Sequence, residues 1–350
     1  MRKFALLKPL LFILVVSLCM TSLIVNVQAE SWSWSKVASP TEAYFESVDM
    51  VDSTDGWAVG SGGSIFRWDG TKWNNVASPT SYQLVSVDMV NSTEGWAISK
   101  RTDGYGNNQS IIRWDGTSWK NVTSPTAGVL TSVDMVNSTD GWAVGFSGII
   151  IRWDGAKWSR VDNPTNYPLE SVDMVSSTDG WAVGRRAVIM RWNGTSWSLA
   201  RGEVGGAWLW SVDMVSSSDG WAVGSGGDIM RWDGTSWEFV TSPTTKHLFS
   251  VDMVNSTDGW AVGSDGCIIH WNGASWSNVT SPTGAWLSCV DMVSSTDGWI
   301  GGADGSIYRW QEEVAGFPAD YLIIIIAVIV VVVVVVWFFL RKRNLKKKSL

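Results

Sequence analysis

The chain has few of the residues from which catalytic and metal sites are usually built. Only two of its 350 residues are histidines and only three are cysteines. The sequence has no GxSxG nucleophile motif, no HExxH zinc motif and no cysteine–histidine cluster with metal-ligand spacing. His247 stands alone, and His270 replaces an arginine of a repeated motif. We therefore expect no catalytic residues, no metal and no cofactor, and we predict that the protein is not an enzyme.

Cysteine is too scarce for a disulfide-stabilised scaffold. Cys19 lies in the apolar segment at the N-terminus, which leaves Cys267 and Cys289 in the rest of the chain. An oxidising compartment would allow one disulfide between these two residues. The sequence permits this bond but does not give the Cα spacing that it requires.

Basic residues are scarce outside the two ends of the chain. Between residues 30 and 320 there are 17 basic and 33 acidic residues, which gives a net charge of −16. Such a surface repels phosphate backbones. We therefore expect no nucleic-acid partner.

Long apolar runs occur only at the two ends. Residues 1–29 have a basic start, an apolar middle and Val27-Gln28-Ala29 at the close. This pattern is typical of a cleaved secretory signal peptide, and the alternative is an uncleaved anchor helix. Residues 321–340 carry no charge and would span about 30 Å as a helix, enough to cross a bilayer. Residues 313–320 would be a linker, and the basic tail at 341–350 predicts a cytoplasmic C-terminus. We predict a single-pass cell-membrane protein whose N-terminal ectodomain lies outside.

The region between these ends, residues 30–312, consists of seven copies of one unit. Each unit has four short apolar segments separated by STDG, a glycine cluster, DG and SPT, and no stretch sustains helical periodicity. Four strands in about 40 residues, repeated, indicate a β-propeller blade. The aspartate of the phrase VDMV marks each unit, at Asp49, Asp88, Asp134, Asp173, Asp213, Asp252 and Asp291. We predict an all-β fold, a seven-bladed β-propeller.

The tryptophans indicate how the ring closes. Seven follow the glycine of the second segment and seven end the third, but only six open the fourth, because the last unit stops near residue 312. Trp34, in the N-terminal phrase SWSWSKVASPT, supplies the missing one. We therefore predict that the N-terminal strand completes the split last blade, which removes exposed sheet edges. We expect the periodic tryptophans to fill the spaces between blades rather than to bind a ligand.

The repeat resembles a known superfamily. The pattern Gly-Trp-Ala-Val-Gly followed by Gly-x-Ile-x-Arg-Trp-Asp-Gly-x-x-Trp is similar to the BNR/Asp-box repeats, and most similar to photosystem II stability/assembly factor-like propellers. The resemblance extends over about residues 31–310 and implies a propeller fold. The segment from Asp69 to Trp73 is one residue shorter than the Asp-box pattern Asp-x-Gly-x-x-Trp. The turn keeps its place between the third and fourth strands, so the fold expectation stands, whereas neither sialidase function nor a function in photosystem assembly is carried over.

Variation between the units is concentrated on one face of the predicted disc. Because successive strands are antiparallel, the loops that join units share a face with the turns between second and third strands. We call this the variable-loop face; its unit-joining loops are residues 41–46, 80–85, 126–131, 165–170, 202–210, 244–249 and 283–288. The nearly invariant turns lie on the opposite, constant-turn face. Variable loops on a rigid scaffold are where binding residues tend to lie.

Aromatic and basic residues that depart from the repeat fall on the variable-loop face. The alternative interpretation for each of them is drift in an unconstrained loop. Our candidate ligand-binding residues are Tyr44, Tyr82, Tyr105, Tyr167, Arg185, Arg186, Trp208, Trp210, His247 and Trp286.

Glycosylation sequons of the form Asn-x-Ser/Thr are frequent. Of the seven, only Asn108 belongs to the variable-loop face, so glycans would cover the opposite face and the rim. The sequons are at Asn91, Asn108, Asn121, Asn137, Asn193, Asn255 and Asn278.

Taken together, these features predict a non-catalytic, membrane-anchored propeller on the cell surface. It would bind a protein or a glycan on the exported side through its variable-loop face. The alternatives are a sialidase-like glycoside hydrolase that uses the same face, and an assembly or maturation factor for a membrane complex. The sequence gives no oligomeric state.

Overall fold

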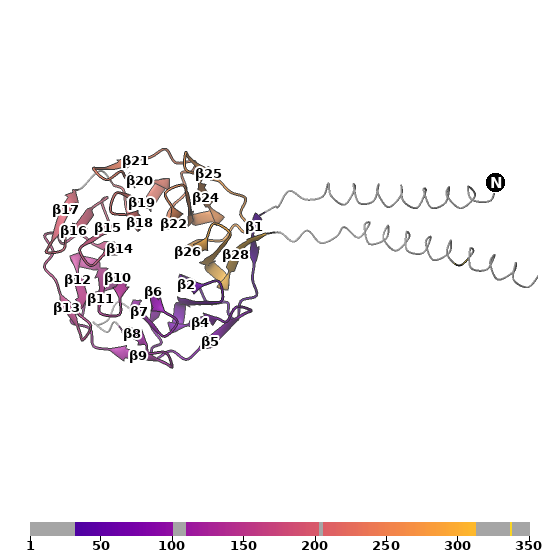
Figure 1. Cartoon of the computed structure of the whole chain (residues 1–350), viewed down its shortest axis with the longest axis horizontal. Helices are drawn as coiled ribbons and strands as arrows, with labels where there is room; N and C mark the ends of the chain where they lie inside the picture. Colours follow the sequence, from indigo (N-terminus) through magenta and orange to yellow (C-terminus); the bar gives the residue numbers. More distant parts are fainter. Residues whose placement is uncertain (1–31, 101–109, 203–205, 313–336, 338–350) are drawn as a thin grey trace, which may run out of the picture. The chain divides into compact units, whose positions relative to one another are not determined.

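The computed structural model describes residues 32–100, 110–202, 206–312 and 337. Residues 34–311 form one compact unit of seven four-stranded antiparallel sheets, arranged as blades around a common centre (Figure 1). The predicted all-β, seven-bladed propeller is thus confirmed.

Each blade runs from an innermost first strand to an outermost fourth strand. The first six blades are β2 (Phe45–Asp52), β3 (Asp55–Gly60), β4 (Ile65–Trp68), β5 (Trp73–Val76); β6 (Gln83–Asn91), β7 (Glu94–Lys100), β8 (Ile111–Trp114), β9 (Trp119–Val122); β10 (Leu130–Asn137), β11 (Asp140–Gly145), β12 (Ile150–Trp153), β13 (Trp158–Arg160); β14 (Leu169–Ser176), β15 (Asp179–Gly184), β16 (Ile189–Trp192), β17 (Trp197–Arg201); β18 (Leu209–Ser216), β19 (Asp219–Gly224), β20 (Ile229–Trp232), β21 (Trp237–Phe239); and β22 (Leu248–Asn255), β23 (Asp258–Gly263), β24 (Ile268–Trp271), β25 (Trp276–Asn278). The seventh blade has the order β26 (Leu287–Ser294), β27 (Asp297–Gly302), β28 (Ile307–Glu312), β1 (Trp32–Lys36).

Short 3₁₀ turns join the second and third strands in five blades. They are η1 (Ser61–Gly63), η2 (Phe146–Gly148), η3 (Ser225–Gly227), η4 (Ser264–Gly266) and η5 (Ala303–Gly305). The middle residue of each turn has a positive φ between 53° and 67°, the left-handed region that suits glycine.

Three tryptophans interlock at every interface between blades. Trp57 of the second strand of blade 1 packs on Trp114 and Trp119 of blade 2, with ring centroids 4.7 and 5.3 Å apart. The second of these contacts is nearly perpendicular, at 86°, which lays a ring edge against a ring face. The same trio recurs around the ring, and its members in the described strands are almost all buried. The periodic tryptophans therefore form the core, as predicted.

The seam of the ring uses the same trio. Trp34 of β1 lies 5.3 Å from Trp260 and 5.5 Å from Trp310, and Trp260 and Trp310 are 4.7 Å apart. Trp34 shares a hydrophobic cluster with Tyr308, and the N–H of Val37 donates to the carbonyl of Ile307. The N-terminal strand therefore closes the ring, as predicted from the missing seventh tryptophan.

The repeated arginine of the third strand is also architectural. Arg67 donates two hydrogen bonds to the carboxylate of Asp55, at 2.7 and 2.9 Å, and lies over the rings of Trp57 and Trp114. Ion pairing within one blade thus holds a cation between the tryptophans of two blades. In blade 6 His270 takes this position and hydrogen-bonds Asp258 at 2.7 Å.

The disulfide that the sequence permits is not formed. Cys267 and Cys289 are free and buried. Cys267 packs with Trp221 of blade 5, whereas Cys289 packs with Phe45 of blade 1. The two thiols belong to different blade interfaces, so they cannot approach each other.

The predictions for the two ends concern residues outside the described ranges. The signal segment 1–29, the linker 313–320, the membrane segment 321–340 and the tail 341–350 lie there, apart from Trp337. Among the described residues, no helix is long and apolar enough to cross a membrane.

Replacing Trp34 by alanine is expected to lower the free energy of unfolding by about 3–5 kcal/mol, because it removes one ring of a buried trio. Trp119→Ala removes the equivalent ring from a blade whose strands are continuous in sequence, and it should cost about as much. Urea unfolding followed by tryptophan fluorescence measures both. If Trp119→Ala lowered the free energy of unfolding by the expected amount and Trp34→Ala hardly changed it, the N-terminal strand would not be what holds the ring closed.

Candidate functional site

Backbone hydrogen bonds make the variable-loop face a firm platform. In six of the blades the residue that begins the turn after the second strand donates its N–H to the loop that enters the same blade, and in blade 2 this turn lies outside the described residues. Examples are Ser225 to Trp208 (2.8 Å), Ser264 to His247 (2.9 Å) and Ala303 to Trp286 (2.9 Å). Side chains on these loops are therefore held in place by strands on both sides.

A β-bulge near the start of every first strand determines which side chains face the centre of this platform. In blade 5, Leu209 pairs with Gly224 and Ser211 pairs with Val223, so Trp210 is the extra residue. The residue before the buried leucine and the residue after it are thus both free to vary. In blade 5 these positions hold Trp208 and Trp210.

Five aromatic side chains from three successive blades form a continuous crescent at these positions. Trp208 contacts Trp210 (6.4 Å between ring centroids), Trp210 contacts both His247 and Phe249 (5.2 Å each), and Phe249 contacts Trp286 (5.7 Å). Trp208 is 39% exposed and Trp286 is 52% exposed. The crescent, defined as Trp208, Trp210, His247, Phe249 and Trp286, is thus a connected aromatic surface open to solvent.

Two features orient the ends of the crescent. The N–H of Gly226 donates to Nδ1 of His247 at 3.0 Å, which fixes the imidazole against the turn of blade 5. At the other side Arg185 forms a β-bridge with Trp208, and its guanidinium lies 4.6 Å from the Trp208 ring and 4.9 Å from Phe146. Glu170 accepts a hydrogen bond from Arg185 at 2.9 Å. The arginine is therefore held by a carboxylate and two rings.

The structure brings together half of the predicted ligand-binding residues. Arg185, Trp208, Trp210, His247 and Trp286 form one connected surface. The others are placed elsewhere: Arg186 lies over Tyr167 at 5.6 Å, Tyr44 hydrogen-bonds Ser288 at the seam between blades 7 and 1, Tyr82 donates its backbone N–H to Thr80, and Tyr105 lies outside the described residues.

Sequence reasoning missed Phe249 and Phe146. Phe249 occupies the bulge position of blade 6, where blade 5 has Trp210 and the other blades have glutamate, valine, threonine or serine, so its departure from the repeat was the available signal. That signal is weak in sequence, because a phenylalanine inside a strand suggests core packing. Only the bulge turns this side chain toward the next blade.

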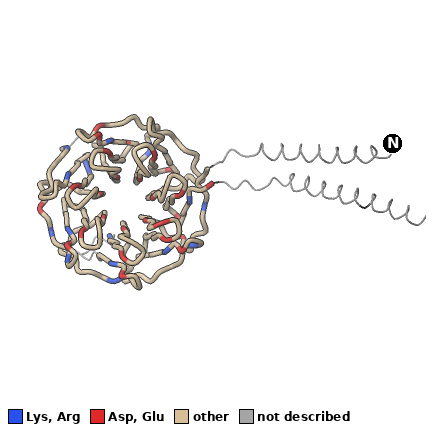
Figure 2. Tube along the Cα trace, viewed as in Figure 1, with Lys and Arg blue, Asp and Glu red and all other residues tan. Residues whose placement is uncertain are grey.

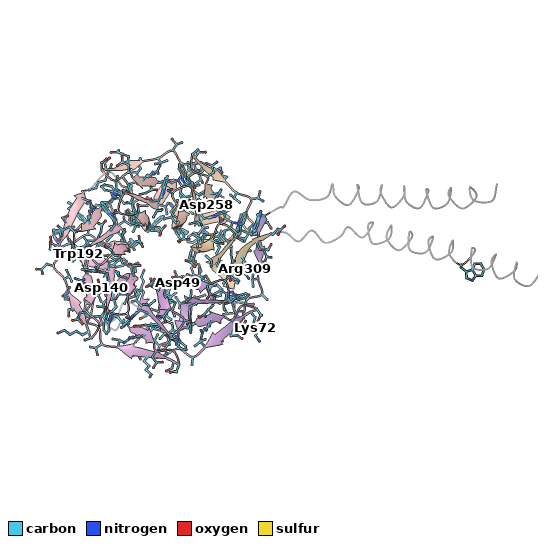
Figure 3. All side chains as sticks on the ribbon, in the orientation of Figure 1. Asp49, Lys72, Asp140, Trp192, Asp258 and Arg309 are labelled. Atoms are coloured by element: carbon cyan, nitrogen blue, oxygen red, sulfur yellow. The ribbon has the colours of Figure 1, made fainter. Side chains whose placement is uncertain are left out.

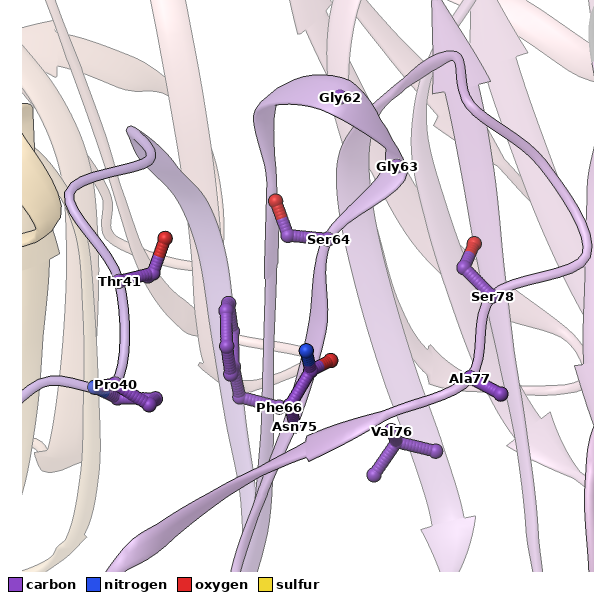
Figure 4. Close-up of a pocket in the computed structure, with 10 residues that line it drawn as sticks. All are labelled: Pro40, Thr41, Gly62, Gly63, Ser64, Phe66, Asn75, Val76, Ala77 and Ser78. Carbon is purple, nitrogen blue, oxygen red and sulfur yellow. The ribbon is translucent and has the colours of Figure 1, made fainter.

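One pocket on this face is lined without any ionisable side chain. It has a volume of about 430 Å³ and lies between the loop entering blade 1 and the turn η1 (Figure 4). Its lining includes Thr41, Gly62, Ser64, Asn75 and Ser78, and none of the lining residues is acidic, basic, histidine or cysteine. Within the described residues no group of three or more histidine, cysteine or acidic side chains could hold a metal ion.

A ring of seven aspartates surrounds the centre of the propeller. Figure 2 shows acidic residues at the inner ends of the blades, and Asp49 lies toward the centre while Lys72 lies toward the outer edge (Figure 3). Oδ2 of each aspartate accepts the backbone N–H of a methionine in the next blade. Met89 donates to Asp49 at 2.6 Å, and Met50 of blade 1 donates to Asp291 of blade 7 at 2.8 Å. An unbroken series of seven such bonds ties the blades together.

Desolvation raises the pKa of every carboxyl in this ring, although each of these side chains is only partly buried. The pKa of Asp49 and of Asp213 rises to about 7, chiefly through desolvation, although each accepts a backbone hydrogen bond that acts in the opposite direction. The pKa of Asp88 is raised well above its ordinary value by burial and by the neighbouring carboxylates, first of all Asp49. Because the residue occurs once in every blade and accepts the same methionine N–H each time, its role is architectural.

The constant-turn face carries the sequons. In the turn after β6, Oδ1 of Asn91 accepts hydrogen bonds from the N–H and the hydroxyl of Thr93, and Asn137 and Asn255 do the same in their blades. Asn193 lies in the turn after the third strand of blade 4. Asn121 and Asn278 lie on outer strands and donate to proline carbonyls, and Asn108 lies outside the described residues. All six described sequon asparagines are exposed.

Comparison with known proteins defines the class of fold. No family model and no curated protein matches the chain. Among solved structures it is similar to YCF48 bound to a D1 peptide (18% identity, 80% of this chain and 95% of that chain, TM-score 0.66). It is also similar to YCF48 from Cyanidioschyzon merolae (19%, 80% and 99%, 0.65) and to the WD40 propeller domain of Doa1 (13%, 82% and 99%, 0.66). The expected likeness to photosystem II assembly factor propellers is confirmed at the level of the fold.

The aspartate ring predicts that stability falls as pH rises. A carboxyl whose pKa is higher in the folded state binds more protons there, so the free energy of unfolding decreases between pH 3.8 and about 7. Asp49→Asn keeps the acceptor for Met89 and removes the charge. At pH 8 it should be more stable than the parent by roughly 1–3 kcal/mol, and the difference should shrink as the pH falls and vanish only below about pH 3.8.

Asp69→Asn is the control, because hydrogen bonds from Thr71 and Lys72 lower the pKa of Asp69 in its exposed turn. This variant should not gain stability at high pH. Urea midpoints from pH 5 to pH 8 measure both effects. An Asp49→Asn variant that is less stable than the parent at pH 8 would refute the assignment.

Proposed function

We propose that this protein is a non-catalytic scaffold that binds a segment of a partner protein across its variable-loop face. The observation that carries the proposal is the crescent, a connected set of aromatic rings with two exposed tryptophans on a platform held by hydrogen bonds. Large, rigid aromatic side chains are the usual anchors of protein interfaces. The positions before and after the buried leucine of each first strand are not needed for core packing. The leucine itself fills the core in every blade except the first, where phenylalanine does so.

The fold comparison is compatible with this role. One of the similar structures is YCF48 bound to a D1 peptide, which shows that a propeller of this architecture can hold a peptide. Partner binding of this kind also suits an assembly or maturation factor for a membrane complex, which is the specific form of scaffold that we favour. The sialidase-like alternative has less support, because the third-strand arginines of the described blades are held in ion pairs beneath tryptophans.

A glycan is the second candidate ligand. The exposed rings of Trp208 and Trp286 could stack on sugar rings, and Glu46 and Gln83 nearby on the face of blades 1 and 2 form a hydrogen-bonded polar pair. Screening the purified full-length chain on a glycan array and against a peptide library separates the two ligands.

Trp286→Ala and Trp208→Ala should each weaken binding of library-selected peptides at least tenfold, because truncating an exposed anchor at an interface costs about 2 kcal/mol or more. Their free energies of unfolding should change by less than about 0.5 kcal/mol, as for other surface positions. Leu199→Ala and Phe239→Ala are matched controls, since these side chains are 48% and 46% exposed on the outer strands β17 and β21. Binding that survives both tryptophan substitutions, or that is lost in the controls, would contradict the proposal. Titration by isothermal calorimetry gives the affinities.

We also propose that the propeller is exported and anchored by residues 321–340. The support is the composition of residues 1–29 and 321–350, together with exposed sequons on the constant-turn face. Deleting residues 321–350 should release the protein into the medium, and protease added to intact cells should digest the propeller of the full-length chain. Mass spectrometry should find glycans on Asn91, Asn137, Asn193 or Asn255. A full-length protein that stays protected in intact cells would contradict export.

We further infer that the repeats belong to the BNR/Asp-box superfamily. The support is the turn after the third strand, where Oδ1 of Asp69 accepts the N–H groups of Thr71 and Lys72, an arrangement repeated at Asp115 and Asp233. A sequence profile built from the seven units should rank Asp-box propellers above WD40 propellers. The reverse ranking would count against the inference.

A further inference from the structure

The most exposed tryptophan of the crescent is flanked by two acidic turns. Trp286 accepts the N–H of Ala303 from its own turn, η5, and its neighbour Ala285 accepts the N–H of Gly266 from the preceding turn, η4, at 2.8 Å. Asp304 follows Ala303 directly, and Asp265 precedes Gly266. The two turns that carry Asp265 and Asp304 are therefore hydrogen-bonded to Ala285 and Trp286, the residues around the exposed ring.

Both aspartates occupy a backbone conformation that does not favour them. Asp265 has φ 53° and Asp304 has φ 56°; the equivalent residues of blades 1 and 5 are Gly62 and Gly226, at 67° and 66°, and those of blades 3 and 4 are Ser147 and Arg186, at 58° and 60°. An ordinary side chain in this region costs roughly 1 kcal/mol or more relative to glycine. Replacing either aspartate by glycine is therefore expected to relieve backbone strain.

The two carboxylates are exposed and lack a cation. Among the described residues neither forms an ion pair, and the Lys246 ammonium donates to the backbone carbonyl of Asp265 rather than to its carboxylate. A third acidic residue extends the row, because Gly305 of η5 packs against Thr41 and Glu42 of the next loop. The described basic side chains of this face are Lys246, which lies beside η4, and Lys100, Arg185 and Arg186, which belong to blades 2 and 4.

We propose that the partner segment bound by the crescent is basic, and that one of its lysine or arginine side chains lies over Trp286 between Asp265 and Asp304. This inference rests on the proposed function. A cation over an indole face is attracted by the ring, and carboxylates on either side strengthen the attraction. The net charge of −16 between residues 30 and 320 would attract the same partner at long range. A second copy of this chain is a poor occupant, because it carries the same excess of negative charge.

The test uses the purified full-length chain and an unbiased random-peptide library. Peptides whose capture requires Trp286 should be enriched in lysine or arginine. A chosen basic peptide, and its copies with glutamine or glutamate in place of the basic residues, are then compared by calorimetry. The glutamine copy should bind at least roughly tenfold more weakly, and affinity for the basic peptide should fall as salt is raised.

Asp265→Gly and Asp304→Gly remove the two carboxylates while placing glycine where the backbone prefers it. Each should weaken the basic peptide several-fold, and the double variant at least tenfold, while the urea midpoint stays equal or rises. Glu238→Gln, which removes an exposed carboxylate from the outer strand β21, should leave affinity unchanged. Lost affinity with retained or raised stability is a result that a merely structural role for these aspartates would not give.

The outcomes separate this inference from the function on which it rests. Peptides that depend on Trp286 but carry no excess of basic residues, or that bind the glycine variants normally, would overturn the basic-partner proposal and leave the binding function standing. A library that yields no crescent-dependent peptide would overturn both. Self-association of the chain that is lost in Trp286→Ala would identify a second copy as the occupant and overturn the basic-partner proposal as well.

Discussion

The whole propeller depends on the contact between one second-strand tryptophan and two tryptophans of the next blade. A four-stranded sheet of this size cannot bury enough apolar surface alone, so each blade is stable only against its neighbours. Trp57, Trp114 and Trp119 provide that contact in blade 1, and six equivalent trios complete the circle. The seam trio differs only in origin: Trp34 comes from the other end of the chain. Closure is therefore a requirement of packing, since without it Trp260 and Trp310 would face water.

The aspartate ring shows a different balance of forces. Each carboxyl satisfies a methionine N–H of the next blade, and an unsatisfied buried N–H would be costly. Repeating the same solution seven times gathers seven acidic groups around one centre, where burial and mutual repulsion raise their pKa values. Each methionine N–H favours the ionised carboxyl, whereas desolvation and the neighbouring carboxylates favour the protonated one. Because the same bond is repeated in seven blades, the stability of the whole propeller depends on pH.

The fold was predictable from the sequence because its determinants are repeated. One tryptophan in a strand says little, but twenty at fixed positions and a twenty-first at the N-terminus determine blade number, strand order and closure together. The site was predictable only in part, because its residues occur once. Trp208, His247 and Trp286 were recognisable as departures from the repeat. Phe249 was not, because the direction of its side chain depends on a bulge that no residue type marks. The separation of Cys267 and Cys289 likewise depends on the rotation between blades.

Function in such a molecule can be sought where the repeat leaves freedom. The leucine at the start of each first strand is buried, so its neighbours on either side, Trp208 and Trp210 in blade 5, are released from packing by the bulge. The middle residue of each turn between the second and third strands is also free of core packing, and its positive φ suits glycine. Where the chain keeps Asp265 and Asp304 at this position, it accepts strain beside an exposed tryptophan. Departures from the repeat that cost stability are stronger evidence of selection for binding than those that cost nothing. Ser147 and Arg186 adopt the same conformation in blades 3 and 4, so strain alone does not single out Asp265 and Asp304. Their turns adjoin the exposed Trp286, and the combination of strain, charge and an exposed ring makes this sector our candidate for the centre of recognition.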